Sequence, residues 1–118
     1  MRKPKQRETP ELLRRLKTFL SYDPLSGNLV FTDTRRGAVE IGKVAGYVDK
    51  SSGGYIRFYH RGQLYMAHRV AWALHYGNWP EYTIDHINRD PSDNRIENLR
   101  DVPQFVNNTN KSKYQKRG

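Results

Sequence analysis

Two stretches of the chain carry apolar residues at helical spacing. The first begins at Thr9-Pro10, because threonine is a good N-cap and proline fits the first helical turn. Its apolar positions are Leu12, Leu13, Leu16, Phe19 and Leu20. Asp23-Pro24 should end it, since the residue before a proline avoids the helical region. The second stretch, residues 67–76, is closed by Gly77. The pattern therefore predicts two helices, and we expect the second to pack on a small sheet.

Between these helices the apolar positions alternate, as they do in half-buried strands. The expected strands are residues 29–32, 44–48, 55–59 and 64–66, separated by turns rich in Gly, Asp and Asn. In the third of them, Ile56 and Phe58 alternate with Tyr55, Arg57 and Tyr59. Tyrosine and arginine on an open sheet face suit nucleic acid, through stacking and phosphate contacts. An ordinary amphipathic sheet with half-covered tyrosines has the same pattern, and both interpretations are open.

Residues 82–110 have a different organisation. Asp85-His86 lies between Ile84 and Ile87 in a predicted strand, and a polar turn follows at 88–94. A second strand is expected over residues 96–100, and then a helix with Asp101 as its N-cap. The order strand, loop, strand, helix, added to the preceding elements, predicts one small α+β domain.

Composition narrows the class of protein. The chain has 118 residues, and 21 Lys and Arg against 12 Asp and Glu give a net charge of +9, which suits a phosphate-rich partner. Cysteine is absent, so disulfides, a disulfide-linked partner and a thiolate zinc site are excluded. No apolar run has membrane-spanning length, and the basic N-terminus lacks the apolar stretch of a signal peptide. We therefore expect a cytoplasmic protein without a membrane partner, of undetermined oligomeric state.

The residue types around Asp85-His86 suit metal-assisted hydrolysis. A carboxylate and an amide oxygen are hard ligands for Mg²⁺, and a neutral histidine can accept a proton from water. Taken singly, these residues have simpler explanations: Asp85 can cap a turn, His86 can be a half-buried side chain, and Asn98 can bridge the backbone of a loop. Neighbours on a strand point to opposite faces, so Asp85 and His86 can act together only where the strand ends or twists.

The ordered motifs resemble a known family. D-H-I-N at residues 85–88, D-N-R-x-x-N-L-R at 93–100 and N-N at 107–108 are similar to the HNH endonucleases, in particular the small phage and intron-homing type. The similarity is dense over residues 66–108 and looser over 22–65. It implies a C-terminal ββα-metal unit and a metal-dependent endonuclease that hydrolyses DNA to 5′-phosphate and 3′-hydroxyl ends, in a phage or prophage protein acting in a bacterial host.

The resemblance also implies roles for single residues. Asp85 and Asn107 would hold one divalent ion, Mg²⁺ in the first place or Mn²⁺, and His86 would activate the attacking water. Asn98 would bridge the loop and orient His86, whereas Asn94 is expected only to form the loop, and Asn108 to face elsewhere. The residues expected to contact DNA are His68, Arg69, Arg35, Arg36, Arg95 and Arg100, the last two as phosphate clamps.

The sequence thus predicts four parts: a basic arm at residues 1–8, a helix and sheet at 9–65 that contact DNA, the nuclease core at 66–110, and a basic tail at 111–118. Two alternatives remain. One is a DNA-binding module whose nuclease site has decayed, which the intact site residues oppose. The other is a nuclease acting on structured RNA, which the tyrosine-rich sheet keeps open.

Overall fold

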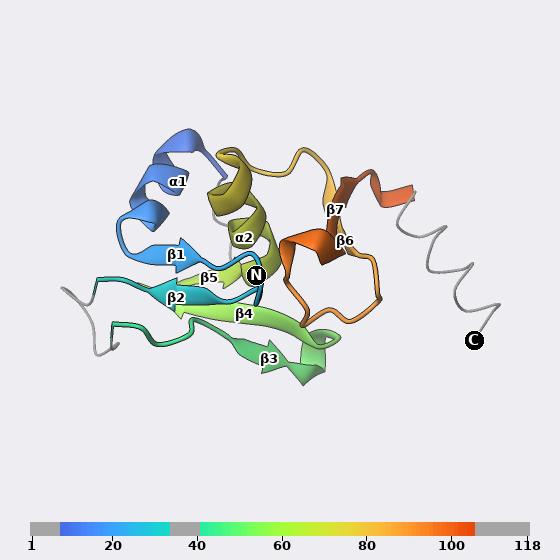
Figure 1. Cartoon of the computed structure of the whole chain (residues 1–118), viewed down its shortest axis with the longest axis horizontal. Helices are drawn as coiled ribbons and strands as arrows, with labels where there is room; N and C mark the ends of the chain where they lie inside the picture. The colour runs from blue at the N-terminus through green and yellow to red at the C-terminus, as the bar shows by residue number, and fades with distance from the viewer. Residues whose placement is uncertain (1–7, 34–40, 106–118) are drawn as a thin grey trace.

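A computed structural model describes residues 8–33 and 41–105 of the chain (Figure 1). Two helices, α1 (Pro10–Lys17) and α2 (Ala67–Tyr76), lie beside three small antiparallel sheets. The sheets are formed by β1 (Leu20–Tyr22) with β2 (Leu29–Phe31), by β3 (Tyr47–Asp49), β4 (Tyr55–His60) and β5 (Gln63–Met66), and by β6 (Thr83–His86) with β7 (Leu99–Val102). Two short 3₁₀ helices, η1 (Lys50–Ser52) and η2 (Ile96–Asn98), complete the elements. The α+β class predicted from the sequence is confirmed.

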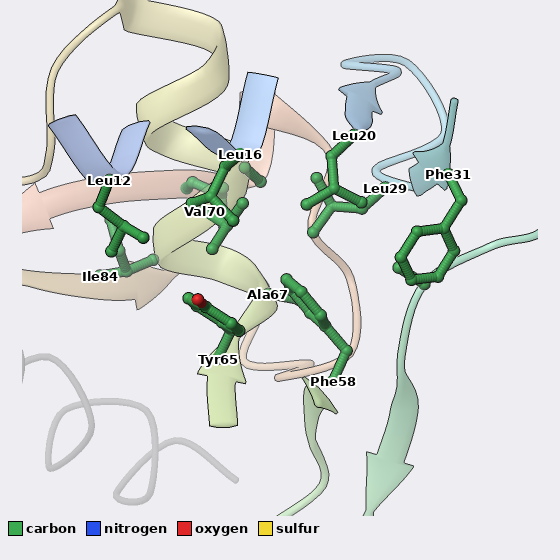
Figure 2. Close-up of a cluster of buried hydrophobic side chains, with 13 residues drawn as sticks. Leu12, Leu16, Leu20, Leu29, Phe31, Phe58, Tyr65, Ala67, Val70 and Ile84 are labelled. Carbon is green, nitrogen blue, oxygen red and sulfur yellow. The ribbon is translucent and has the colours of Figure 1, made fainter. Parts of the chain in front are cut away.

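One apolar core joins the two predicted halves of the chain. Leu16 of α1 and Val70 of α2 are its largest fully buried side chains, and Phe58 of β4 and Leu99 of β7 belong to the same cluster. Figure 2 shows Leu16, Val70 and Phe58 within this cluster, between the helices and strands. As predicted, α2 packs on the sheet, against β4 and β5, and Gly77 closes it with a left-handed backbone. Truncating a core leucine, as in Leu16→Ala, would lower the free energy of unfolding by about 2–5 kcal/mol.

The first helix is shorter than predicted. The hydroxyl and the N–H of Thr18 both donate to the carbonyl of Arg15, which ends α1 after Lys17. Leu20, expected on the helix, instead lies in β1 and pairs with Phe31. Either structure buries Leu20, so the apolar spacing alone could not separate a helix from a turn followed by a strand.

Three other predicted elements are shifted. Val44 forms only an isolated bridge with Val30, because Gly46, which has a positive φ, separates it from β3. In the C-terminal unit, the strand predicted at residues 96–100 is a 3₁₀ helix, η2, up to residue 98, and β7 begins only at Leu99. Asp101 is not a helix N-cap: it lies in β7, and its carboxylate accepts hydrogen bonds from the N–H groups of Glu81 and Tyr82, both at 2.7 Å. Helical backbone begins at residue 104, near the end of the described part.

Neither described helix is long and apolar enough to cross a membrane. The predicted basic arm at 1–8, apart from Glu8, and the tail at 111–118 lie outside the described residues, as do Arg35, Arg36, Asn107 and Asn108.

Candidate active site

The strand β6 ends at the two residues that the sequence singled out. Asp85 pairs with Arg100 across the β6–β7 sheet, and His86 pairs with Leu99. Both residues are buried, each 7% exposed. On a regular strand the side chains of Asp85 and His86 would point to opposite faces. His86 is the last residue of β6, so the regular strand ends at this pair, as joint action of the two residues requires.

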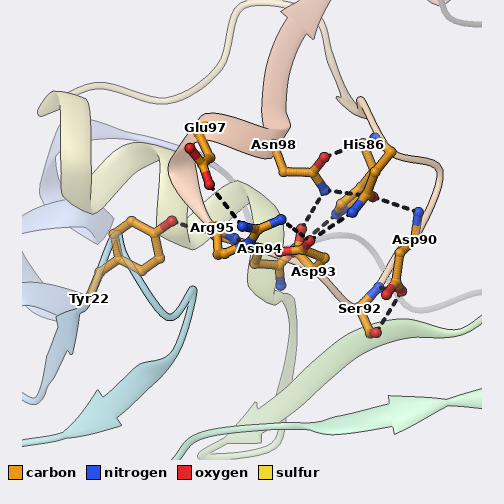
Figure 3. A network of polar contacts seen from close by, with 10 residues as sticks. Tyr22, His86, Asp90, Ser92, Asp93, Asn94, Arg95, Glu97 and Asn98 are labelled. Carbon is orange, nitrogen blue, oxygen red and sulfur yellow. Dashed lines mark hydrogen bonds and ion pairs between the residues drawn. The ribbon is translucent and has the colours of Figure 1, made fainter.

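Asn98 holds the β6–β7 loop, residues 87–98, in a closed shape. Its Oδ1 accepts a hydrogen bond from the backbone N–H of Asn88 at 2.8 Å. Its Nδ2 donates to Oδ1 of Asn88 at 3.0 Å and to the backbone carbonyl of Asp93 at 2.8 Å. Figure 3 shows the Asn98 side chain pointing into the loop, with a dashed contact from its amide toward Asp93. The bridge that the sequence predicted for Asn98 is therefore confirmed, but its amide is not the hydrogen-bond partner of His86.

The partner of His86 is Asn94. The Nε2 atom of His86 lies 2.8 Å from Oδ1 of Asn94, which is only 2% exposed. Because an amide oxygen only accepts, Nε2 carries the proton in this bond, and a neutral ring then keeps its lone pair on Nδ1. Sequence reasoning treated Asn94 as a loop residue and missed this contact. An eight-residue separation across an irregular loop has no periodicity from which the contact could be read.

Two aromatic rings surround His86 on other elements. The ring of His68, in α2, has its centroid 5.5 Å from that of His86, and the ring of Tyr55, in β4, lies at 5.9 Å. Burial lowers the pKa of His86, although Asn94 and the nearby carboxylates of Asp85, Asp90 and Asp93 oppose that shift. His86 is therefore held in the neutral form that a general base requires.

His68 does not occupy the predicted place on a phosphate-binding surface. It is buried, and its Nδ1 atom has no hydrogen-bond partner among the described residues. Burial lowers the pKa of His68 to about 3, and the neighbouring His86 and Arg69 contribute smaller shifts in the same direction. The ring is a neutral wall of the site rather than a cationic contact for DNA.

Two of the arginines that the sequence predicts to contact DNA, Arg95 and Arg69, make hydrogen bonds within the protein. Arg95 contacts Asp93 through Nε at 2.8 Å and Nη2 at 2.7 Å, and Glu97 through Nη1 at 2.8 Å. Arg95 thereby holds the pKa of Asp93 down at about 2. Arg69 donates to Glu8 and to the carbonyls of Tyr82 and Pro80. These contacts give both guanidinium groups a role in holding the fold.

Arg100 differs, because its partner is the candidate metal ligand. Its Nε and Nη2 lie 3.1 and 2.6 Å from Oδ2 of Asp85, and within the described residues no hydrogen bond reaches Oδ1 of that carboxylate. A free carboxylate oxygen suits Mg²⁺, which keeps several of its waters. No group of three His, Cys, Asp or Glu side chains in residues 8–33 and 41–105 is placed to enclose an ion. Of the two predicted metal ligands, Asp85 lies in the described part of the chain and Asn107 lies outside it.

Comparison with known proteins agrees with this geometry. Residues 65–108 match the family model of the HNH endonucleases. This segment belongs to the HNH endonuclease family. It contains Asp85, His86, Asn94 and Asn98, and it extends to Asn107 beyond the described part.

A solved structure extends the likeness beyond the HNH segment. The HNH homing endonuclease I-HmuI, in a study of its DNA binding and cleavage, shares the fold with a TM-score of 0.58 and 22% sequence identity. The match covers 82% of this chain and 53% of that protein, so the chain spans about half the length of I-HmuI. No curated protein matches the sequence.

Proposed function

We propose that this protein is a metal-dependent DNA endonuclease that hydrolyses phosphodiester bonds to 5′-phosphate and 3′-hydroxyl ends. The observation that carries the proposal is the state of His86: a buried, neutral imidazole next to Asp85, fixed through Nε2 by Asn94, in a segment of the HNH family. A neutral histidine of this kind can take the proton of an attacking water at neutral pH.

Each residue of the proposed site then has one role. His86 accepts the proton of water at Nδ1, the nitrogen that Asn94 leaves unbonded. Asn98 keeps the β6–β7 loop closed around that ring. Asp85 and Asn107 would hold one divalent ion, Mg²⁺ or Mn²⁺, which when bound stabilises the negative charge on the phosphate and on the leaving 3′ oxygen.

The substrate class rests on charge and on one exposed sheet face. Tyr47 and Arg57 are cross-strand partners, and Tyr59 lies two residues beyond Arg57, so the three side chains share a face of the β3–β4–β5 sheet. Tyr47 and Tyr59 are 47% and 59% exposed. We call Tyr47, Arg57 and Tyr59 the outer sheet face. With a chain charge of +9, this face is suited to hold a nucleic acid. DNA is favoured because I-HmuI, which shares the fold, is described as binding and cleaving DNA.

A plasmid-nicking assay tests the proposal. With Mg²⁺ the protein should convert supercoiled DNA to the nicked form, EDTA should stop the reaction, and structured RNA should stay intact. DNA ligase alone should reseal the nicks, because 5′-phosphate and 3′-hydroxyl ends need no further processing. Binding without cutting would support the decayed DNA-binding module instead. Cutting of RNA in preference to DNA would assign the other substrate.

A further inference from the structure

A turn far away in the sequence touches the residue that holds His86. The turn, residues 22–28, connects β1 with β2 in the N-terminal half. The hydroxyl of Tyr22 donates to the backbone carbonyl of Asn94, and the N–H of Ile96 donates to the carbonyl of Pro24 at 3.1 Å. Figure 3 shows the Tyr22 side chain reaching from its strand toward this loop. Two hydrogen bonds thus flank the backbone of Asn94 and Arg95 on the side of the turn.

Gly27 makes the contact between the two segments very close. A Cβ atom at this position would lie 2.5 Å from the backbone nitrogen of Arg95 and 2.6 Å from the carbonyl carbon of Asn94. Gly27 also has a φ of +83°, which favours glycine. Since the atoms it would strike are backbone atoms of the loop, a side chain at Gly27 would have to push Asn94 and Arg95 away.

The turn is itself well braced. The N–H of Gly27 donates to the carbonyl of Asp23 at 2.8 Å, and the N–H of Asp23 donates to the carbonyl of Asn28 at 2.9 Å. The carboxylate of Asp23 accepts a hydrogen bond from the N–H of Leu25 at 3.1 Å. The surface that meets Asn94 is therefore a fixed one, set by contacts within the turn.

These contacts form a short path to the catalytic ring. The turn holds the backbone of Asn94, and the side chain of Asn94 holds Nε2 of His86. The path matters because an imidazole has two nitrogens and a rotatable ring. Only a fixed ring presents the same basic nitrogen to the water in every turnover. The turn of residues 22–28 is thus the outer support, and Asn94 the inner one.

We propose that residues 22–28, acting through Asn94, are a positioning element for the general base His86. The inference rests on the proposed function, and it adds to the HNH segment a part of the chain that lies outside the family match. A misplacement of about 1 Å in a catalytic group can cost about 100-fold in rate, so a displaced Asn94 should lower the chemical step without weakening DNA binding.

The first test is a matched pair of glycine substitutions. Gly27→Ala strains a left-handed backbone and pushes on Asn94, whereas Gly62→Ala strains a left-handed backbone of φ +76° with nothing within 4 Å of the new Cβ. At saturating DNA, the single-turnover rate of Gly27→Ala should fall about 10- to 100-fold. Gly62→Ala should cut within about twofold of the parent, and neither variant should lose DNA affinity beyond that. Equal rates for the two variants would overturn the proposal.

A second variant guards against misfolding of Gly27→Ala. Tyr22→Phe keeps the ring and removes only the hydroxyl that donates to Asn94. Its cleavage rate should fall several-fold while its melting curve remains cooperative.

A further pair of variants tests Asn94 itself. Asn94→Ala removes the oxygen that accepts from His86, whereas Asn94→Asp keeps an acceptor oxygen. Asn94→Asp should therefore retain a large share of the cleavage rate that Asn94→Ala loses. A rate for Asn94→Ala equal to the parent's would reject the inner support.

The deciding readout does not depend on cleavage. Nitrogen NMR of the histidine rings, in protein without DNA, should show His86 protonated at Nε2 in the parent and in Gly62→Ala. In Gly27→Ala and Asn94→Ala the two tautomers should mix. A slow Gly27→Ala with an unchanged His86 spectrum would refute the positioning role. Running His86→Ala beside these variants separates the two proposals: if it cuts at the parent rate, the proposed base is wrong, whereas if it alone is slow, only the positioning element is wrong.

Discussion

The β6–β7 loop and the outer sheet face use polar residues in opposite ways. In the loop, Asn94 and Asn98 are almost fully buried, and the hydrogen bonds of both amides end on groups of the same small region. On the sheet, Tyr47 and Tyr59 stand open to solvent. If His86 is the base, as we propose, the geometry around it is formed before substrate arrives, as electrostatic preorganisation requires, whereas the side chains proposed to bind nucleic acid remain available to a partner.

The two regions meet at one end of β4. Tyr55, its first residue, contacts His86, and Tyr59 lies four residues further along the same strand. At the preceding turn, a Cβ on Gly54 would lie 3.3 Å from Pro91 of the β6–β7 loop. A duplex that lies along the outer sheet face is therefore led toward His86. Separate substitutions in the two regions should affect separate steps of the reaction.

The largest expected effect belongs to the loop. His86→Ala removes the proposed general base and should lower the cleavage rate about 10²–10⁴-fold. DNA affinity should be unchanged, since the imidazole is not proposed to hold metal or phosphate. Single-turnover rates and a binding isotherm measure the two quantities. A variant that cuts at the parent rate would remove His86 from the mechanism.

On the sheet the expected effect is the reverse. Replacing both Tyr47 and Tyr59 by serine should weaken DNA binding about tenfold, because exposed aromatic groups on a sheet face supply contact area to nucleic acid. The rate at saturating DNA should remain that of the parent. Tyr76→Ser is a suitable control, since Tyr76 is also about half exposed but lies on α2. If the double variant binds normally but cuts slowly, the sheet is not the binding face.

The α+β fold class and the position of Asp85 and His86 at a strand end could be predicted, because they depend on local patterns and a dense motif. Asp85 and His86 lie at the end of β6, and Asn98 ends the loop that follows, so their order along the chain needs only neighbouring residues. The errors arise from side-chain and strand partners that local patterns do not specify. Leu20 pairs with Phe31, and Asp101 accepts hydrogen bonds from the amides of residues 81 and 82. Arg95 is paired with the carboxylates of Asp93 and Glu97.

The missed role of Asn94 is the clearest case. Its backbone is held by Tyr22, 72 residues away, and its side chain by His86 across an irregular loop. Neither contact leaves a period or a motif in the sequence, so only the folded chain shows them.

A smaller effect should distinguish two arginines of the C-terminal unit. In a His86→Ala background that binds but does not cut, with Mg²⁺ present, Arg100→Ala should make the slope of log affinity against log salt shallower by about one unit. That difference changes the ratio of the affinities at 50 and 200 mM salt about fourfold. Arg95→Ala should leave the slope unchanged, because Asp93 and Glu97 already occupy its guanidinium. An identical slope for both variants would mean that Arg100, like Arg95, does not contact a phosphate.

The smallest expected effect is that of metal removal on stability. Asp85 is buried, and a buried carboxylate without a counter-ion would destabilise the fold. Arg100 supplies that counter-ion from the chain itself, with Nη2 2.6 Å from Oδ2. The fold therefore does not depend on a divalent ion to balance this charge. EDTA should stop cleavage and shift the unfolding midpoint by less than about 2 °C, unlike a structural zinc, whose binding energy is folding energy. Asp85→Asn should be inactive and cooperatively folded, with a midpoint equally insensitive to EDTA. Melting curves of both proteins, with and without the chelator, make the comparison. A fall of many degrees in the parent on adding EDTA would mean that the ion, and not Arg100, balances the charge of Asp85.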